Sequence, residues 1–242
     1  MIIEDISESE EYLTKNKLLR DGAHIVGAAL KSGAQEAEAF LLKGKDTYFD
    51  IERDRISHVS SGNYYGIGVR VIKDGKIGFG YTTSPDRGQT VIDHAIRLSR
   101  ISKPTRIELP DGKGLGGPVP DVFDTTSLEL EFQDMRDMAE TVVSSAKGYR
   151  KDIIVSNGGF GMGVEYVALV NSNGLEVADA RTTISTSAYC VSKAHGISTG
   201  FDFAISTCMA DIRPEIVGES AARLCAFGER SRKLRKRVTD VL

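Results

Sequence analysis

The chain has 242 residues, of which 40% are hydrophobic and 27% charged, and its formal net charge is −3. This composition predicts a globular chain with one large or two ordinary domains, and it excludes a wholly disordered protein. The 31 basic side chains are matched by 34 acidic ones, which argues against a protein built to coat nucleic acid.

The ends of the chain and its cysteines bear on its location. The first residues are acidic and polar, whereas a signal peptide begins basic and turns apolar. No apolar run approaches the roughly 18–20 residues of a membrane span. Cys190, Cys208 and Cys225 are odd in number and too far apart for a Cys-x-x-Cys pair. The sequence therefore predicts a reducing, cytoplasmic location.

The first part of the chain begins with a predicted helix and two short strands. Apolar residues recur at helical spacing from about Glu10 to Ser32, and Gly33 is expected to end that helix. Polar and apolar residues then alternate over Thr47–Arg53 and Arg55–Ser61, as expected of strands. Gly62-Asn63 is a turn signal, so we expect the chain to reverse there.

A hairpin over Gly66–Thr83 is the clearest local pattern. Asp74-Gly75 favours a two-residue type I′ turn, which needs positive φ at both residues. The register then follows, with large side chains lying over glycines opposite them. The expected pairs are Val71 with Gly78, Val69 with Gly80, Arg70 with Phe79, and Gly68 with Tyr81.

A second helix is predicted after this hairpin, followed by a change in composition. Ser84 is expected to be its N-cap, with Pro85 at the first helical position and Asp86 complementing the helix dipole. Four of the six prolines fall between Lys103 and Thr126. We interpret this stretch as a linker or long surface loop and place a domain boundary in it.

The second part of the chain repeats the pattern of helix, strands and helix. A helix is predicted from about Ser127 to Gly148, and a last one over Arg213–Phe227 with Pro214 in its first turn. Turns are expected at Gly158-Gly159 and over Asn171–Gly174. The four strands predicted around these turns are Ile153–Asn157, Val164–Val170, Leu175–Ser192 and Phe201–Met209.

These elements predict an α+β fold of two units, each an antiparallel strand meander with flanking helices. Residues 1–103 form the first predicted domain, 104–126 the Pro/Gly-rich linker, 127–228 the second domain and 229–242 a basic tail. We find no residue-level repeat between the units, so their likeness is architectural.

The histidines do not predict a metal site. A zinc peptidase needs two imidazoles on one helix face and a nearby carboxylate base. His24, His58, His94 and His195 lie far apart, and none is followed by Glu. We interpret each as a surface or core histidine, and we name no catalytic, cofactor-binding or metal-ligating residue.

Other candidate motifs also have plainer interpretations. Gly196–Gly200 matches Gly-x-Ser-x-Gly, but a strand follows it where a nucleophile elbow needs a helix. Gly112–Gly117 matches Gly-x-Gly-x-x-Gly, but prolines follow, so no helix starts there to bind a phosphate. A Cys190–His195 nucleophile pair is less favoured than a buried structural cysteine. The six positive charges of 230–237 favour a solvated end over a nucleic-acid site.

Several segments together resemble the TldD/PmbA family, also described as modulators of DNA gyrase. They are Gly66–Thr83, Val167–Leu175, Arg181–Thr183 and Glu215–Arg223, and their order and spacing extend the resemblance over roughly residues 10–228. The PmbA-like branch fits better than the TldD-like branch. In this family of cytoplasmic metallopeptidases the chain continues for about as long again into a carboxy-terminal domain. The resemblance implies zinc in that domain of the TldD-like member, in a His-Glu-x-x-x-His motif.

The resemblance implies a non-catalytic amino-terminal half of a peptidase subunit, truncated relative to the family. Such a half would contribute to a dimer interface and to a chamber for unfolded or leader peptides, in proteolysis or peptide maturation. Its partner would be a TldD/PmbA-like subunit, as a homo- or heterodimer. Peptide capture by strand addition along Leu175–Ser192 is a further hypothesis. The alternative is a stand-alone module that binds gyrase or an antitoxin without proteolysis.

Overall fold

The computed structural model describes residues 4–105, 107–114, 117, 119–194 and 196–230. Helices and antiparallel strands both contribute large parts of the fold, which confirms the α+β class. None of the helices in these ranges is long and apolar enough to cross a membrane. The elements are α1 (Glu4–Lys31), β1 (Glu36–Glu52), β2 (Arg55–Lys73), β3 (Lys76–Thr82), a 3-10 turn at Pro85–Arg87, α2 (Gly88–Ile101), α3 (Thr125–Leu128), α4 (Phe132–Tyr149), β4 (Ile154–Asn171), β5 (Glu176–Ser192), β6 (Ser198–Ser206), a 3-10 turn at Met209–Asp211 and α5 (Pro214–Gly228).

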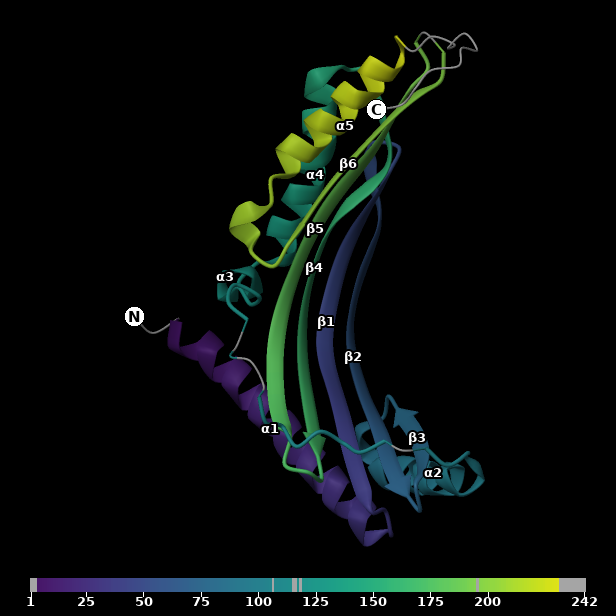
Figure 1. The fold of residues 1–242 in the computed structure, drawn as a ribbon. Helices are drawn as coiled ribbons and strands as arrows, with labels where there is room; N and C mark the ends of the chain where they lie inside the picture. Colours follow the sequence, from purple (N-terminus) through teal and green to yellow (C-terminus); the bar gives the residue numbers. More distant parts are fainter. Residues whose placement is uncertain (1–3, 106, 115–116, 118, 195, 231–242) are drawn as a thin grey trace.

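The strands form one continuous sheet in the order β3-β2-β1-β4-β5-β6, with every neighbouring pair antiparallel. The two predicted meanders are present, and they are joined edge to edge. β1 pairs with β4 from Glu38, opposite Asn171, to Glu52, opposite Asn157. Figure 1 shows these long strands running the length of the molecule and bending on the way. The division at 104–126 remains a prediction, and the sheet is continuous across the two units that it would separate.

Two predicted turns are wrong. β2 continues through Gly62-Asn63, and β4 continues through Gly158-Gly159. The chain reverses instead at Arg53-Asp54, where both residues have positive φ, 51° and 67°. A Cβ atom at Gly159 would lie 2.4 Å from the Phe49 carbonyl oxygen of the neighbouring strand. Glycine is therefore needed here for close approach between strands, a use that gives the same sequence signal as a turn.

The hairpin around Asp74-Gly75 is confirmed with the expected register, including Val71 opposite Gly78. Phe79 does lie over Gly68, 3.4 Å from where its Cβ would be. Gly78, however, faces α2 rather than a covering side chain. Its Cβ would lie 1.7 Å from the Ala95 carbonyl oxygen, so the absence of a side chain lets the helix pack directly on the strand.

The predicted helices are found with altered ends. The helix predicted from Glu10 begins at Glu4. The helix predicted over 127–148 is two helices, α3 and α4, because Glu131 begins a new helix through a capping box with Asp134. Ser84 is the N-cap residue, as predicted, but it caps the 3-10 turn Pro85–Arg87 that precedes α2, and its side chain forms no capping hydrogen bond.

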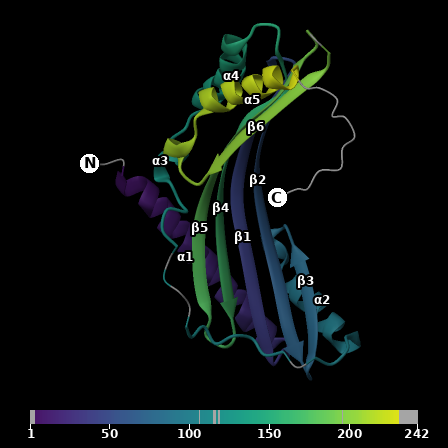
Figure 2. The same ribbon diagram turned by 45° about the horizontal axis from the view of Figure 1, so that its top comes forward.

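Both pairs of helices cover the same face of the sheet, at opposite ends (Figure 2). Side chains of β1 alternate, and its buried residues Leu41 and Phe49 lie on one face. Leu41 belongs to the core with α1 and α2, which also includes Ile25 and Ile92. Phe49 belongs to the core with α4 and α5, which also includes Val142. The face of the sheet that points away from the helices is called the open face below.

The long segment between α2 and α3 is anchored to the sheet. The Asn171 amide donates to the Pro110 carbonyl oxygen at 2.8 Å, beside the β4–β5 turn. At the other end the Asp124 carboxylate accepts from Ser127, Thr126 and the Met209 backbone N–H. Burial raises the pKa of Asp124, but these hydrogen bonds outweigh it and lower the pKa to about 2. The ionised carboxylate thus joins α3 to the turn before α5.

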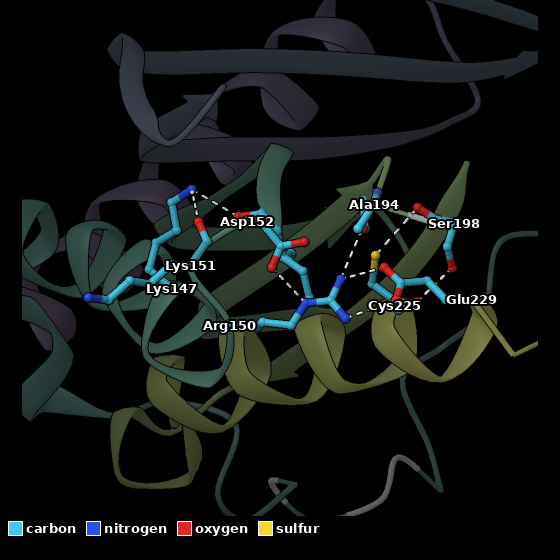
Figure 3. A network of polar contacts seen from close by, with 10 residues as sticks. Lys147, Arg150, Lys151, Asp152, Ala194, Ser198, Cys225 and Glu229 are labelled. Atoms are coloured by element: carbon cyan, nitrogen blue, oxygen red, sulfur yellow. Dashed lines mark hydrogen bonds and ion pairs between the residues drawn. The ribbon is translucent and has the colours of Figure 1, made fainter. Parts of the chain in front are cut away.

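An ion-pair network joins the ends of α4 and α5 (Figure 3). The Arg150 guanidinium donates to the Glu229 carboxylate with Nη1 2.9 Å from Oε2, and Nη2 contacts the other carboxylate oxygen. Nη2 also donates to the Ser192 hydroxyl at 2.9 Å, and Nε lies 2.8 Å from Asp152. The Glu229 side chain is 6% exposed, so Arg150 compensates a buried charge.

Candidate functional site

The three histidines that the structure describes lie on different elements. His24 lies on α1, His58 on β2 and His94 on α2, and all three side chains are exposed, while His195 lies outside the described residues. Within the described ranges, no group of three or more His, Cys, Asp or Glu residues could hold a metal ion. The residues present therefore do not fit the zinc site of a peptidase.

The residues weighed as nucleophiles have structural surroundings. Cys190 is fully buried in the core beside Cys225, and burial, with the nearby Cys225, raises its pKa to about 12. A thiol with that pKa stays protonated at neutral pH. Ser198, the serine of the Gly-x-Ser-x-Gly match, begins a strand and donates to the Cys225 carbonyl oxygen at 2.6 Å. Of the basic tail, Arg230 is described and exposed, and the rest lies outside the described residues.

The open face presents aromatic side chains at both edges of the sheet. Phe79 and Tyr81 stack on β3 with ring centroids 6.5 Å apart, and Phe201 and Phe203 stack on β6 at 5.7 Å. Apolar groups this exposed, on a face without helices, indicate a contact surface. The most exposed are Tyr81 (76%), Ile205 (64%), Phe203 (60%), Phe201 (51%) and Phe79 (50%).

The centre of the open face carries tyrosines and carboxylates over glycines. The Tyr48 ring lies 2.4 Å from where a Gly161 Cβ would be, and the Asp46 carboxylate 2.3 Å from a Gly163 Cβ, so glycine lets both side chains lie flat on β4. The Tyr64 hydroxyl donates to Glu165 at 3.4 Å, a weak hydrogen bond. Burial and the nearby carboxylates raise the pKa of Tyr64 to about 12.

A shallow groove of about 390 Å³ lies on this face between the tyrosine centre and β6. Its floor includes Gly159 and Gly161, and its walls include Tyr48, Phe201 and Phe203. A glycine floor leaves backbone accessible, and aromatic walls offer flat apolar contact. Such a groove fits the apolar side chains of an extended chain better than it fits a compact charged ligand.

The carboxylates at the centre predict a measurable pH effect. Burial, and the negative charge of Glu165, raise the pKa of Asp46 above its ordinary 3.8. The folded chain therefore binds this proton more tightly than the unfolded chain, so stability falls as pH rises through the interval above 3.8. Asp46→Asn is expected to stabilise the chain at pH 7 by less than about 1 kcal/mol, because the group is partly exposed.

Urea unfolding between pH 3 and 8 would measure this effect. The advantage of Asp46→Asn should shrink as the pH falls below about 4, where the native carboxyl group is protonated too. Glu165→Gln serves as the companion variant, since it removes the repelling charge and should lower the pKa of Asp46. If Asp46→Asn stabilises the chain as much at pH 3 as at pH 7, the raised pKa of Asp46 is contradicted.

A larger cleft of about 750 Å³ lies on the helix-covered side, between α1, α2 and the sheet. It contains Lys17 and Asp21, which form an exposed ion pair at 2.7 Å, and Tyr65, whose pKa is raised by burial and then by Asp21. The charges around it are mixed, so they favour no one class of ligand.

None of the open-face residues is predicted as a site from the sequence. The available signal was the alternation of glycines at 159, 161 and 163 along β4, which placed small residues on one face. That pattern was divided by the turn predicted at Gly158-Gly159, and the predicted strand began only at Val164. The aromatic residues on β1, β3 and β6 are brought beside these glycines by pairing of strands far apart in the chain.

Comparison with known proteins identifies the family. Residues 37–100 match the model of PmbA/TldA metallopeptidase domain 1, and residues 122–225 match that of the PmbA/TldA metallopeptidase central domain. The chain belongs to the TldD/PmbA family. An uncharacterised protein of Methanocaldococcus jannaschii is 30% identical over 154 residues, which are 62% of this chain and 34% of that protein.

Solved structures share the fold. A proposed DNA gyrase modulator of Bacteroides thetaiotaomicron superposes with a TM-score of 0.75 at 23% identity, over 86% of this chain and 49% of that chain. TldE of Thermococcus kodakarensis gives 0.72 at 22%, over 83% and 46%. A proposed gyrase modulator of Thermotoga maritima gives 0.74 at 18%, over 84% and 46%. The chain thus spans about half the length of these relatives and about a third of the M. jannaschii protein.

Proposed function

We propose that this chain is the non-catalytic amino-terminal half of a TldD/PmbA-type peptidase subunit of the PmbA-like branch, acting in the cytoplasm. It lines a chamber in which unfolded or leader peptides are bound for proteolysis or maturation. Zinc and the catalytic base are supplied by a carboxy-terminal domain or by a TldD-like partner subunit, because the residues described here do not fit a zinc site.

The open face is the observation that carries this proposal. It combines a glycine floor, exposed aromatic pairs at both edges and a carboxylate centre. Aromatic and backbone contacts bind many sequences without strict preference, as a chamber for unfolded peptides requires. The carboxylates of Asp46 and Glu165 favour peptides with basic residues or a free amino terminus.

The pairing of β5 excludes strand addition over part of Leu175–Ser192. β5 lies between β4 and β6 from Ile184 to Ser192, so that part of the strand has no free edge. Its outer side near Thr182 is also occupied, because the Thr182 N–H donates to the Val122 carbonyl oxygen at 3.1 Å. We assign the peptide contacts to side chains on the open face, which presents more exposed apolar surface than this edge.

A photo-crosslinking experiment tests the proposal. A benzophenone amino acid at Phe203 is expected to label a denatured, lysine-rich peptide when the chain is mixed with a zinc-bearing TldD-like subunit. The same label at Ile101, which is 81% exposed at the end of α2, is the matched control and should give little product. Cleavage of the peptide should appear in the mixture and be absent with this chain alone.

Two outcomes would count against the proposal. Equal labelling from both positions would show that the open face has no preference for peptide. Peptide hydrolysis with stoichiometric zinc by the purified chain would contradict its non-catalytic role. Specific labelling of a folded protein partner without any cleavage in the mixture would favour the alternative of a stand-alone interaction module.

A further inference from the structure

Strand pairing places the open-face groove next to the carboxylate centre. Residues that lie opposite one another across the strands form a row, and Tyr48, Gly161 and Ser185 make up one row of the open face. The next row on the same face contains Asp46 and Gly163. Such rows are two residues apart along each strand, which corresponds to about 7 Å. The Asp46 carboxylate therefore lies one row away from the wall of the groove.

The groove itself is suited to one large apolar side chain. Ser185 and Ser187 of β5 add small residues to its floor, and they lie opposite Ile205 and Phe203 of β6, both of which are exposed. The Tyr48 ring forms the opposite wall. A side chain that enters between these walls exchanges water for apolar contact on two sides. The groove therefore favours an aromatic or a large aliphatic residue.

The Asp46 carboxylate forms no ion pair with any residue in the described part of the chain. Burial and the charge of Glu165 raise its pKa, so Arg181, which lies opposite Glu165, does not compensate it. Asp50 lines the groove too, but it is exposed and water solvates its charge. An ammonium or guanidinium group bound beside Asp46 would relieve the repulsion there.

An extended peptide that lies along the strands repeats the spacing of these rows. Its alternate side chains point to the same face about 7 Å apart, whereas adjacent side chains point to opposite faces. Such a peptide can fill the groove and reach Asp46 at once when the apolar and the basic residue are two positions apart. Four positions would separate the two side chains by about 14 Å, which exceeds one row. Either chain direction gives the same spacing.

We propose that the open face selects extended peptides in which an aromatic or large aliphatic residue stands two positions from a Lys or Arg. The apolar side chain occupies the groove, and the basic side chain binds the Asp46 carboxylate. The inference rests on the proposed function and deepens it, because it names the class of peptide sequence that this face prefers. A helix of a partner protein would instead present side chains three or four positions apart on one face.

Fluorescence anisotropy of labelled peptides with the full 242-residue chain tests the spacing. The probes are acetylated, amidated Ser/Gly peptides that contain one Phe and one Lys, either two positions apart or adjacent. The spaced peptide is expected to bind about three- to fivefold more tightly, the range for a partly exposed ion pair. Asp46→Asn should make the two affinities equal. Glu140→Gln, which removes an exposed carboxylate from α4, is the matched control and should keep the preference.

A variant that fills the groove separates this inference from the proposed function. Ser187→Phe places a ring where the peptide side chain would enter, so it should weaken binding of both peptides, and circular dichroism verifies its fold. Equal affinities of the two peptides for the native chain, or a preference that persists in Asp46→Asn, would overturn the inference. If the affinities are equal and Ser187→Phe lowers both, the open face still binds peptides and the proposed function stands. Binding of neither peptide would count against both.

Discussion

Gly78→Ala is expected to destabilise the chain by about 3 kcal/mol or more, because its new methyl group would occupy the position of the α2 backbone. The Cβ would lie 1.7 Å from the Ala95 carbonyl oxygen and 2.8 Å from the Ser99 nitrogen. Neither atom belongs to a flexible side chain, so the whole helix must move away from β3. That movement would open the core that Val91 and Ile92 form with the sheet.

Thermal unfolding followed by circular dichroism measures this effect. A loss of about 3 kcal/mol in a chain of this size lowers the Tm by about 6–12 °C. Gly27→Ala is the matched control, since Gly27 lies inside α1 and a Cβ there would meet no atom within 4 Å. It should stabilise the chain by about 0.5–1 kcal/mol through helix propensity. Equal effects of the two changes would contradict the packing of α2 on β3.

Arg150→Ala is expected to destabilise the chain by about 2–3 kcal/mol. The guanidinium forms an ion pair with Glu229, whose side chain is 6% exposed, and it also binds Ser192 and Asp152. Removing the guanidinium takes away the contacts that it makes with both Glu229 carboxylate oxygens, and losing one partner of a buried pair costs more than the net value of the pair. The partial exposure of Arg150 places the expected loss below that of a fully buried pair. The α4 and α5 ends would separate first.

Urea unfolding of two further variants isolates the electrostatic part. Adding Glu229→Gln to Arg150→Ala should recover part of the loss, because a neutral amide is less costly to bury than a carboxylate. Arg136→Ala removes an exposed i, i+4 ion pair with Glu140 and should cost no more than about 0.5 kcal/mol. If Arg150→Ala costs no more than Arg136→Ala, the network in Figure 3 does not stabilise the fold.

Local sequence patterns correctly predicted the elements whose conformation is fixed by residues next to one another in the chain. The Asp74-Gly75 turn needs positive φ at adjacent positions, and the observed φ values are 51° and 67°. The register of its hairpin followed from the turn length. α5 begins at Pro214, where a fixed φ and a missing N–H suit the first helical turn. These features depend on no residue distant in the chain.

Both wrongly predicted turns contain glycine, a residue that serves two different structural purposes. At Asp74-Gly75 it permits a positive φ, whereas at Gly159 it permits a neighbouring strand to approach. The sequence does not distinguish these uses, since the atom that would clash with a Gly159 side chain belongs to Phe49, over a hundred residues away. The true turn at Arg53-Asp54 was missed for the converse reason: it has positive φ without glycine.

The sequence by itself determined the α+β class and most of the elements, because alternation, helical spacing and turn chemistry are local properties. The family followed from the resemblance of four segments to known members. Tertiary structure decided that β1 pairs with β4, which merges two meanders into one sheet. It also decided which face is open. Along β1 both Leu41 and Phe40 are apolar, and packing of the helices buries the first and leaves the second 45% exposed. That choice depends on contacts between distant segments, which no local pattern specifies.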